Sequence, residues 1–516
     1  MNRLEDDLRT TAARHGDRPA VFDGTTRLSY AELAATAEAI AQALTARGVA
    51  EGDCVVWHGA KNAAAVAVVH GILLAKAGYV PVDPDGPIAR ARLIADTCRP
   101  RALVVDAAAR DQWAEAGTDL AWQPLSGVPG PADALWFAIP GTPPRPALPD
   151  LAYVLHTSGS TGRPKGVVHT HRSAQAFVDW SVAELELTAD DVIVNSAPLH
   201  FDPSTLHLFG AARVGAAVAL VPATAATFPA TYLQFCREAG ATVLYAVTST
   251  MAWLTRRGRE LMPGLDALRA VVFGGEVMQP ADMNVLLDAW PRARFLNVYG
   301  PTESNVATFH ELRTREIPPE GGVPIGRPLP GTHVLVVDPG HSPVAPGKPG
   351  ELLVRGATMM AGYLDPDDTA RAFVRTADGL EWYATGDHVR TDETGELEFI
   401  GRRDGQIKSR GFRVELGEIE RHLRAIDGVR ECVVVATPQP VVSTVITAFV
   451  DAPEHVARAL PQLLADRVPH YMIPERFIAV AGELPRNANG KADRNRLAGL
   501  AAQPSLDDVA GFIPVR

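Results

Sequence analysis

The chain has 516 residues, of which 47% are hydrophobic, and its formal net charge is −11 at pH 7. A chain of this length exceeds what one hydrophobic core organises, so we expect two or more domains. The negative charge is spread along the chain without a basic patch, which argues against nucleic acid or an acidic membrane surface as a partner.

Cysteine usage and the N-terminal segment predict a cytoplasmic protein. Cys54, Cys98, Cys236 and Cys432 lack the spacing of a metal site or a CxxC motif and are typical of reduced thiols. The first ten residues are charged, and the apolar stretch of a signal peptide does not follow them.

The N-terminal quarter predicts alternating strands and helices. Residues 1–50 suggest two helices around a short turn, and Cys54–Trp57 suggests a strand. Ala63–Ala75 reads as a buried helix and is too short to cross a bilayer. The alternation continues through Val104 and implies a parallel α/β sheet. Residues 123–150 are rich in proline and glycine and suggest a surface connection.

The segment Thr157–Gly166, TSGSTGRPKG, follows an apolar run that predicts a strand over Ala152–His156. Gly159 and Gly162 allow backbone angles that a Cβ would forbid, so successive N–H groups can converge on one anion. A lone cluster of glycine and serine is more often a surface turn, but the added hydroxyls and Lys165 favour a phosphate-binding loop. Since Gly-Val follows the lysine, the loop is not a Walker P-loop.

This segment resembles the signature of the adenylate-forming superfamily, which includes acyl-CoA synthetases, luciferases and the adenylation domains of nonribosomal peptide synthetases. Companion motifs lie between residues 28 and 497. The resemblance implies an α/β fold with a large N-terminal domain of stacked α/β sheets and a small β-barrel-like unit. A small, mobile α+β lid domain follows. The implied boundaries are 1–403 and 404–516, with a hinge at Asp404.

Further motifs of this superfamily follow the predicted strands Val192–Pro198 and Arg269–Phe273, and Thr242–Tyr245 is predicted as another strand. The resemblance implies that Tyr299 stacks on adenine and that Asp387 binds the ribose hydroxyls. It implies a nucleotide site made of Thr157, Ser158, Gly159, Ser160, Thr161, Gly162, Lys165, Gly274, Gly275, Glu276, Asn297, Tyr299, Gly300, Asp387 and Arg402. The implied catalytic residues are Lys491, Glu303 and Thr302, with Glu303 holding Mg²⁺.

The resemblance also implies that Asp202, in the Phe-Asp-Pro-Ser motif, pairs with the α-ammonium of an amino acid. Alone, this aspartate would be read as an N-cap of the following helix. A buried carboxylate is costly without a cation, which makes the ammonium a sensible partner. The substrate pocket then consists of Asp202, Pro203, Leu206, Tyr245, Val272, Gly274, Val298, Val306, Ala307 and Lys491. Between Asp202 and Lys491 the wall is neutral and mostly aliphatic, which favours a small or medium apolar amino acid. The arrangement resembles that of proline-activating free-standing domains, which implies proline ahead of alanine, valine or a β-amino acid.

Three classes of function remain open. The leading prediction is a ligase that uses ATP and Mg²⁺ to form an aminoacyl adenylate. It then transfers the acyl group to the phosphopantetheine thiol of a separate carrier protein. The first alternative is an acyl-CoA ligase acting on a small carboxylic or β-amino acid. The second is a nucleotide-binding module without catalysis, against which Glu303, Asp387 and Lys491 together argue.

The C-terminal part predicts the antiparallel strands of the barrel-like unit and then the lid. Short strands with frequent glycine and proline extend from Gly322 to Gly362. The lid is expected to contain a hairpin at Gln406–Val414, a helix at Glu415–Leu423, strands at Cys432–Ala436 and Val445–Val450, and a helix at Ala457–Arg467.

Overall fold

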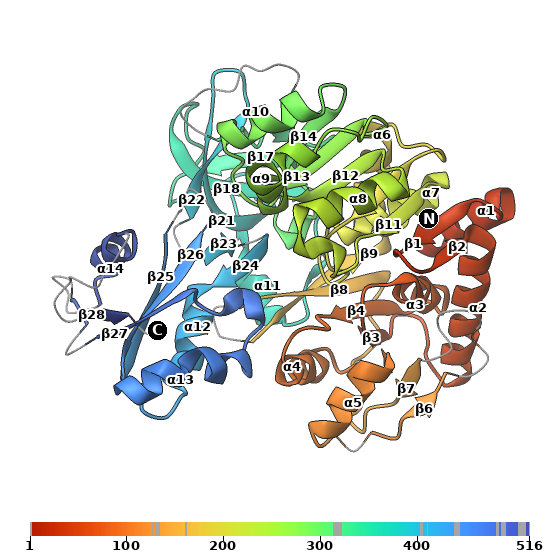
Figure 1. Cartoon of the computed structure of the whole chain (residues 1–516), viewed down its shortest axis with the longest axis horizontal. Coiled ribbons are helices and arrows are strands. Elements are labelled where there is room, and N and C mark those ends of the chain that lie inside the picture. Colours follow the sequence, from red (N-terminus) through yellow and green to blue (C-terminus); the bar gives the residue numbers. More distant parts are fainter. Residues whose placement is uncertain are drawn as a thin grey trace. The chain divides into compact units, whose positions relative to one another are not determined.

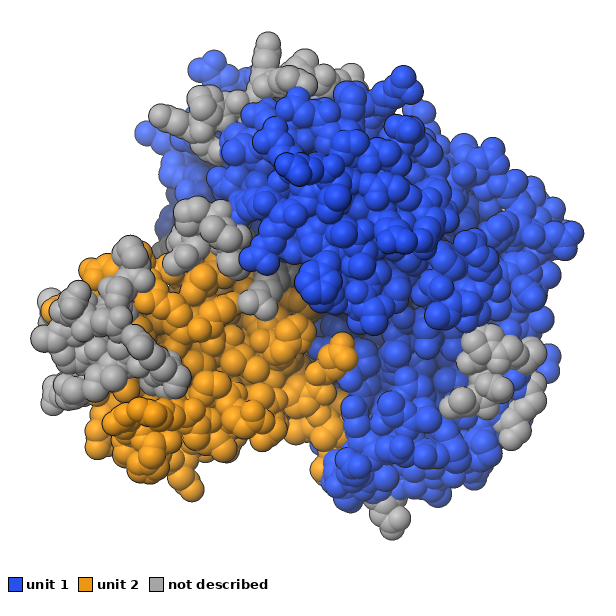
Figure 2. Space-filling model, in the orientation of Figure 1, with its two compact units in different colours: residues 1–84, 94–156, 165–401 blue, residues 85–93, 157–164, 402–516 orange. Residues whose placement is uncertain are grey.

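The computed structural model describes residues 3–118, 120–125, 128, 135–159, 163–312, 322–402, 406–409, 411–437, 444–480, 484–486, 492–503 and 512–514. It is a mixed α/β protein in which the chain divides into a larger and a smaller compact unit (Figures 1 and 2). The larger unit comprises residues 1–84, 94–156 and 165–401, and the smaller one comprises residues 85–93, 157–164 and 402–516.

Most of the predicted site residues lie on the strands of a nine-stranded mixed sheet or in the segments that follow these strands. Its order is β16 (Arg327–Pro328), β15 (Thr308–Leu312), β14 (Arg294–Tyr299), β13 (Ala270–Gly274), β12 (Val243–Val247), β10 (Val192–Asn195), β11 (Ala217–Leu220), β1 (Pro19–Phe22) and β2 (Arg27–Ser29). The run from β14 to β1 is parallel, and β15, β16 and β2 join antiparallel at the two edges. The carboxyl ends of the parallel strands therefore meet at one edge.

The central strands are apolar on both faces, as expected for a sheet covered on both sides. In β12, Val243 and Tyr245 belong to one core cluster, whereas Leu244 and Ala246 belong to another. The second cluster includes residues of three helices that pack on that face (Figure 1). These helices are α8 (Pro229–Ala239), α9 (Thr248–Arg257) and α10 (Pro280–Ala289). Tyr245 therefore faces away from these helices.

An eight-stranded sheet also contributes residues to the cluster that contains Val243 and Tyr245. Its order is β19 (Gly362–Tyr363), β9 (Lys165–Thr170), β8 (Leu151–Thr157), β4 (Gly78–Val82), β3 (Cys54–His58), β5 (Ala102–Val105), β7 (Trp136–Ala138) and β6 (Gln123–Pro124). The shared core contains residues of both large sheets together with α1 (Leu4–His15), α2 (Tyr30–Ala46), α3 (Ala63–Leu74) and α6 (His171–Glu184). Every residue of α3 is buried, which matches its uninterrupted apolar sequence.

The third sheet of the larger unit has five antiparallel strands. They are β17 (Thr332–Val337), β18 (Pro349–Gly356), β21 (Glu381–Thr391), β20 (Phe373–Arg375) and β22 (Leu397–Arg402). The remaining helices of this unit are α5 (Ala107–Glu115), α7 (Ala211–Val214), α11 (Pro366–Ala372), the π-helix η2 (Leu206–Gly210), and the 3₁₀ turns η3 (Ala225–Thr227), η4 (Arg259–Leu261) and η5 (Thr302–Ser304). A further helix, α4 (Ile88–Cys98), begins in the segment 85–93 that is grouped with the smaller unit.

The smaller unit is an α+β module. A hairpin of β23 (Gln406–Ser409) and β24 (Phe412–Glu415) precedes a four-stranded sheet of β25 (Glu431–Thr437), β26 (Val445–Asp451), β27 (Arg476–Val480) and β28 (Phe512–Pro514). Its helices are α12 (Leu416–Arg424), α13 (Glu454–Ala465), α14 (Arg494–Ala501) and the 3₁₀ turn η6 (His470–Met472). Gly411 lies at the bend of the hairpin with φ of 81°, a left-handed angle that favours glycine.

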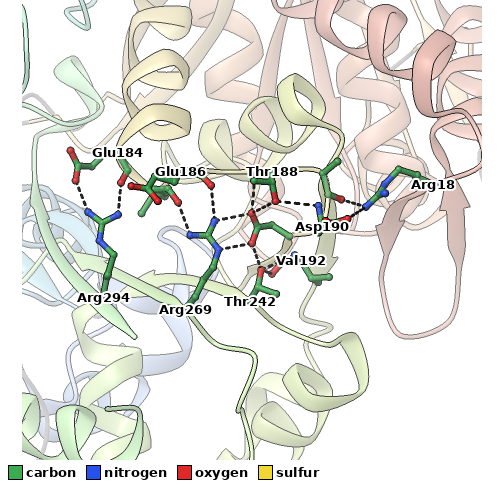
Figure 3. Close-up of polar contacts among 12 residues, drawn as sticks. Arg18, Glu184, Glu186, Thr188, Asp190, Val192, Thr242, Arg269 and Arg294 are labelled. Carbon is green, nitrogen blue, oxygen red and sulfur yellow. Dashed lines mark hydrogen bonds and ion pairs between the residues drawn. The ribbon is translucent and has the colours of Figure 1, made fainter. Parts of the chain in front are cut away.

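Arginine side chains stabilise the amino-terminal edge of the nine-stranded sheet (Figure 3). The guanidinium of Arg269 donates to both carboxylate oxygens of Asp191 at 2.8 and 2.7 Å and to the carbonyl of Leu185 at 2.7 Å. Arg294 donates to the carbonyl of Glu184 and to the carboxylate of Glu311. Asp191, Arg269 and Arg294 precede or begin the parallel strands β10, β13 and β14, so the ion pairs lie at the end opposite to the predicted site.

Two expectations about the N-terminal part are wrong in detail. The connection between the first two helices contains β1 and β2, and the segment 123–150 contains β6 and β7. All four are edge or near-edge strands of two to four residues, too short for alternation to be recognised in the sequence. Within the described part of the chain, every helix is too short or too polar to cross a lipid bilayer.

Candidate functional site

The predicted pocket residues gather at the carboxyl edge of the nine-stranded sheet. Tyr245 on β12 pairs in register with Val272 on β13, and Gly274 on β13 pairs with Val298 on β14. Leu206, Tyr245, Val272, Val298 and Val306 all belong to one apolar cluster, and each is at most 6% exposed. These five residues of the predicted wall therefore lie in one cluster, although they are up to 100 positions apart in the chain.

Asp202 follows β10 and lies near this wall. Burial raises the pKa of the phenols of Tyr153 and Tyr245, and the nearby carboxylate of Asp202 raises both further. Asp202 itself is half-buried, and its backbone carbonyl accepts a hydrogen bond from the N–H of Thr205 at 3.0 Å. The structure thus places one carboxylate beside two phenols and an aliphatic surface.

Two glycines of the predicted site are required by close packing. A Cβ at Gly274 would lie 2.2 Å from the carbonyl oxygen of Val298, and a Cβ at Gly300 would lie 2.5 Å from that of Asn305. Both distances are far below van der Waals contact. Side chains at these positions would push β14 and the turn after it away from the edge of the sheet.

The predicted adenine and ribose residues are in contact. The hydroxyl of Tyr299 donates to the carboxylate of Asp387, and both residues are at most 5% exposed. The backbone N–H of Asp387 donates to the hydroxyl of Thr385. Asn297, predicted to bind nucleotide, donates its side-chain amide to the backbone carbonyls of Val323 and Pro324. Its amide therefore anchors the neighbouring backbone.

A tyrosine connects Glu303 with Lys165. Glu303 is fully buried, and one of its carboxylate oxygens accepts the hydroxyl of Tyr363 at 2.5 Å. The ammonium of Lys165 lies 5.4 Å from the centre of the Tyr363 ring and pairs with Asp368 at 3.2 Å. A cation over an aromatic face is attracted by the ring quadrupole. Sequence reasoning missed Tyr363, since a tyrosine after a glycine is not itself a signal of function.

The described part of the phosphate-loop motif groups with the smaller unit. Thr157 and Ser158 are at most 9% exposed, and the hydroxyl of Ser158 donates to the backbone carbonyl of Arg413 at 2.8 Å. Arg402, the last residue of β22, belongs to the same unit. Several predicted site residues lie outside the described residues: Ser160, Thr161, Gly162, Asp404 and Lys491.

The turn that carries Thr302 and Glu303 ends in an unusual backbone conformation. Asn305 has φ of 54° and ψ of −80°, near the values of a γ-turn that non-glycine residues rarely adopt. Such a conformation costs about 1–3 kcal/mol and persists where the surrounding structure holds it. Its side chain is bonded on both sides, to Tyr153 and to His169.

Two basic side chains near the pocket, Lys61 and the fully buried His207, were also missed. Lys61 donates to the carbonyls of Asn195 and Ala197 at 3.2 and 3.3 Å, and burial lowers its pKa to about 8. The ring of His207 stacks on Tyr245 with centroids 5.4 Å apart, and burial lowers the pKa of His207 to about 3. His207 is thus neutral near pH 7, so it adds no charge to the wall.

Comparison with known proteins identifies the family of the chain. Residues 8–364 match the family of AMP-binding enzymes, and residues 418–491 match the AMP-binding enzyme C-terminal domain. An L-proline–[L-prolyl-carrier protein] ligase of Pseudomonas fluorescens is 36% identical over 511 residues, covering 96% of this chain and 99% of that protein. A protein of the same name from Streptomyces coelicolor is 36% identical over 520 residues, covering 96% of each.

A solved structure extends the likeness to three dimensions. Holo-PA1221, described as an NRPS protein containing adenylation and PCP domains, has a TM-score of 0.78 and 27% identity, covering 96% of this chain and 84% of that one. The fold, the two matched domains and the relatives aligned along nearly their whole length lead to one conclusion: this chain belongs to the AMP-binding enzyme family, within the adenylate-forming superfamily.

Proposed function

We propose that this enzyme is an ATP-dependent ligase that activates L-proline as prolyl-AMP and transfers the prolyl group to the phosphopantetheine thiol of a separate carrier protein. The names of the two proline ligases that align along nearly their full length support this substrate and this acceptor. The use of ATP follows from the family. The buried, free cysteines support a reducing, cytoplasmic location.

The observation that carries the proposal is that the carboxylate of Asp202 lies near a neutral, apolar pocket wall. A carboxylate at the edge of an apolar pocket is stable when it binds a cation, and the ring nitrogen of proline is positively charged at neutral pH. The apolar residues Leu206, Val272 and Val298 suit the three methylene groups of the ring. A fatty or aryl acid has no amine that could bind Asp202.

In the first step, a carboxylate oxygen of proline attacks the α-phosphorus of ATP. A new P–O bond forms to the amino acid, and the bond from the α-phosphorus to the leaving pyrophosphate breaks. Because two anions approach one another and charge builds on phosphorus, the step needs cations. We assign this task to Lys491, which lies outside the described residues.

In the second step, a thiol sulfur attacks the acyl carbon of prolyl-AMP. A thioester forms, AMP leaves with the electrons of the broken C–O bond, and the thiol proton passes to solvent. Movement of the lid about Asp404, also outside the described residues, would withdraw Lys491 after the first step.

We also propose that Glu303 holds Mg²⁺ together with the phosphates of ATP. Its hard carboxylate oxygens suit this ion, which prefers one or two carboxylates plus phosphate and water. The hydroxyl of Tyr363 orients the carboxylate from one side. Among the described residues, no three His, Cys, Asp or Glu side chains gather into a metal site. When bound, Mg²⁺ would neutralise charge on the phosphates.

The test is ATP–pyrophosphate exchange with a panel of proline, alanine, valine, β-alanine, benzoate and a fatty acid. Proline is expected to give the highest kcat/KM. Exchange driven by benzoate or the fatty acid alone, or by none of the panel, would overturn the proposal. Formation of prolyl-CoA from added coenzyme A at the rate of exchange would instead favour the alternative of a CoA ligase.

A further inference from the structure

A chain of buried hydrogen bonds connects the segment that carries Asp202 with the turn that carries Thr302. The hydroxyl of Thr205 donates to the oxygen of Tyr153 at 3.3 Å, and the hydroxyl of Tyr153 donates to the side-chain oxygen of Asn305 at 3.2 Å. The amide nitrogen of Asn305 lies 3.4 Å from Nδ1 of His169. The other ring nitrogen, Nε2, lies 2.8 Å from the backbone carbonyl of Thr302.

The direction of these bonds follows from their chemistry. A carbonyl oxygen can only accept, so Nε2 of His169 must carry the proton that bonds Thr302. Burial lowers the pKa of His169 to about 4, so the ring is neutral near pH 7 and Nδ1 is an acceptor. The hydroxyl oxygen of Ser173 also lies 3.1 Å from Nδ1. The amide of Asn305 donates to Nδ1 and accepts from Tyr153. Every bond therefore runs the same way, from Thr205 to Thr302, and such chains strengthen cooperatively.

The members come from different parts of the larger unit. Tyr153 and His169 lie on β8 and β9 of the eight-stranded sheet, whereas Thr205 and Asn305 follow β10 and β14 of the nine-stranded sheet. All four are at most 4% exposed. The backbone N–H of Thr205 donates to the carbonyl of Asp202. This bond connects the first member of the hydrogen-bond series to the proposed amine-binding residue.

We propose that Tyr153, Asn305 and His169 are positioning residues. They hold the amine-binding residue Asp202 and the phosphate-side turn at Thr302 at the separation that aligns the carboxylate of the amino acid with the α-phosphorus. This inference rests on the proposed function. It assigns a role to three buried residues that are not among the residues predicted to bind either ligand.

The alignment role predicts a particular kinetic signature. We call the row of hydrogen bonds from Thr205 to Thr302 the relay. The amino acid and ATP are proposed to bind at its two ends, so their affinities depend mainly on Asp202 and on the predicted nucleotide-binding residues. Misalignment of two bound reactants by a fraction of an ångström lowers kcat, and an error of 1 Å can cost about 100-fold. Loss of one relay bond is therefore expected to lower kcat while changing the KM values little.

A second tyrosine of this protein provides a matched control for the removal of the Tyr153 hydroxyl. Tyr79 on β4 pairs in register with Tyr153, and the two ring centroids are 5.3 Å apart. Both side chains are fully buried, but the hydroxyl of Tyr79 has no hydrogen-bond partner among the described residues. Tyr79→Phe and Tyr153→Phe thus remove the same atom from neighbouring sites, and only the second breaks the relay.

In ATP–pyrophosphate exchange, we expect Tyr153→Phe to lower kcat about 10-fold with KM for amino acid and ATP changed less than about threefold. Tyr79→Phe should stay within about twofold of wild type, and both variants should melt within a few degrees of it. Equal kcat for the two variants, or a lower melting temperature of Tyr153→Phe with unchanged kcat, would overturn the inference.

Asn305→Gly separates positioning from backbone strain. Glycine adopts the observed angles without strain but lacks the amide, so the variant should fold stably and lose kcat at least as strongly as Tyr153→Phe. Full activity of Asn305→Gly would overturn the relay. The comparison uses whichever amino acid wild type activates best, so preference for another amino acid would refute only the proline assignment.

Discussion

At the amino-terminal and carboxyl-terminal ends of the strands of the nine-stranded sheet, carboxylates bind different kinds of partner. At the amino-terminal edge, the guanidinium of Arg269 pairs with Asp191. At the carboxyl edge, tyrosine hydroxyls donate to Glu303 and Asp387. A guanidinium neutralises a carboxylate, whereas a hydroxyl orients it and leaves its charge in place. The first edge is therefore built for stability, and at the second edge hydroxyls orient carboxylates where ligands are proposed to bind.

Glu303→Gln should have the largest effect among the variants that test this contrast. The substitution keeps the shape of the side chain and removes the charge proposed to hold Mg²⁺. We expect kcat for pyrophosphate exchange to fall about 100- to 1,000-fold, as when one electrostatic group is removed from an active site. Thermal melting should be unchanged or raised, because a fully buried charge is lost. Activity near that of wild type would show that the charge of Glu303 is dispensable.

Tyr363→Phe tests the hydroxyl that orients Glu303 and should have a smaller effect. Removal of a partner of a metal-binding carboxylate typically costs about 10- to 100-fold in affinity or activity. We expect a higher Mg²⁺ concentration for half-maximal exchange, measured by titration at fixed ATP. Phe373→Leu, which changes another aromatic residue of the same apolar cluster, is the control. The interpretation fails if both variants shift the Mg²⁺ requirement equally.

Arg269→Ala tests the opposite edge and should change stability without changing catalysis. The substitution leaves Asp191, whose side chain is 4% exposed, without its guanidinium partner. Loss of hydrogen bonds between charged groups costs about 2 kcal/mol, although partial exposure of the arginine lowers this figure. Urea unfolding should report the loss, while KM and kcat stay unchanged. A drop in kcat with unaltered stability would remove the distinction between the edges.

Acid should weaken the same edge, with the smallest effect of the four. Burial alone would raise the pKa of Asp191, but the hydrogen bonds from Arg269, Thr188 and Thr242 outweigh it and lower that pKa. A lowered folded-state pKa contributes stability above the ordinary aspartate value of about 4, and this stability is lost as pH falls through the folded-state value. Asp191→Asn should therefore be less stable than wild type at pH 7 and should approach it as the pH falls below about 4. A constant difference in unfolding free energy would contradict the assignment.

The sequence predicted those parts of the fold that have strong local patterns. The helix α3 is apolar throughout, and β3, β12 and β13 are continuous apolar runs, so their positions were predicted to within two residues. The strands β6 and β7 were missed because each has only two or three residues. Their pairing depends on the edge of the eight-stranded sheet, which no local pattern reveals.

Residues of the candidate site could be predicted where they belong to a sequence motif. They could not be predicted where their role depends on contacts with distant segments. Gly274 and Gly300 stand in motifs, and the structure gives the steric reason for both. Tyr153 looked like an ordinary core residue of a strand, and nothing local distinguishes it from Tyr79. The difference lies in the hydroxyl partners that Tyr153 acquires from distant segments, which only the folded arrangement reveals.

The central claim is that Asp202 binds the ammonium of an amino acid, and the most direct measurement compares two substrates on two proteins. Proline and cyclopentanecarboxylate share a five-membered ring and a carboxylate, but only proline has the amine. Wild type should exchange pyrophosphate with proline far better than with cyclopentanecarboxylate. Asp202→Asn should lose about 100-fold or more in kcat/KM for proline, as expected for the loss of a buried charge pair, while KM for ATP is unchanged. If Asp202→Asn activates proline as well as wild type does, or if wild type uses both acids equally, the account is wrong.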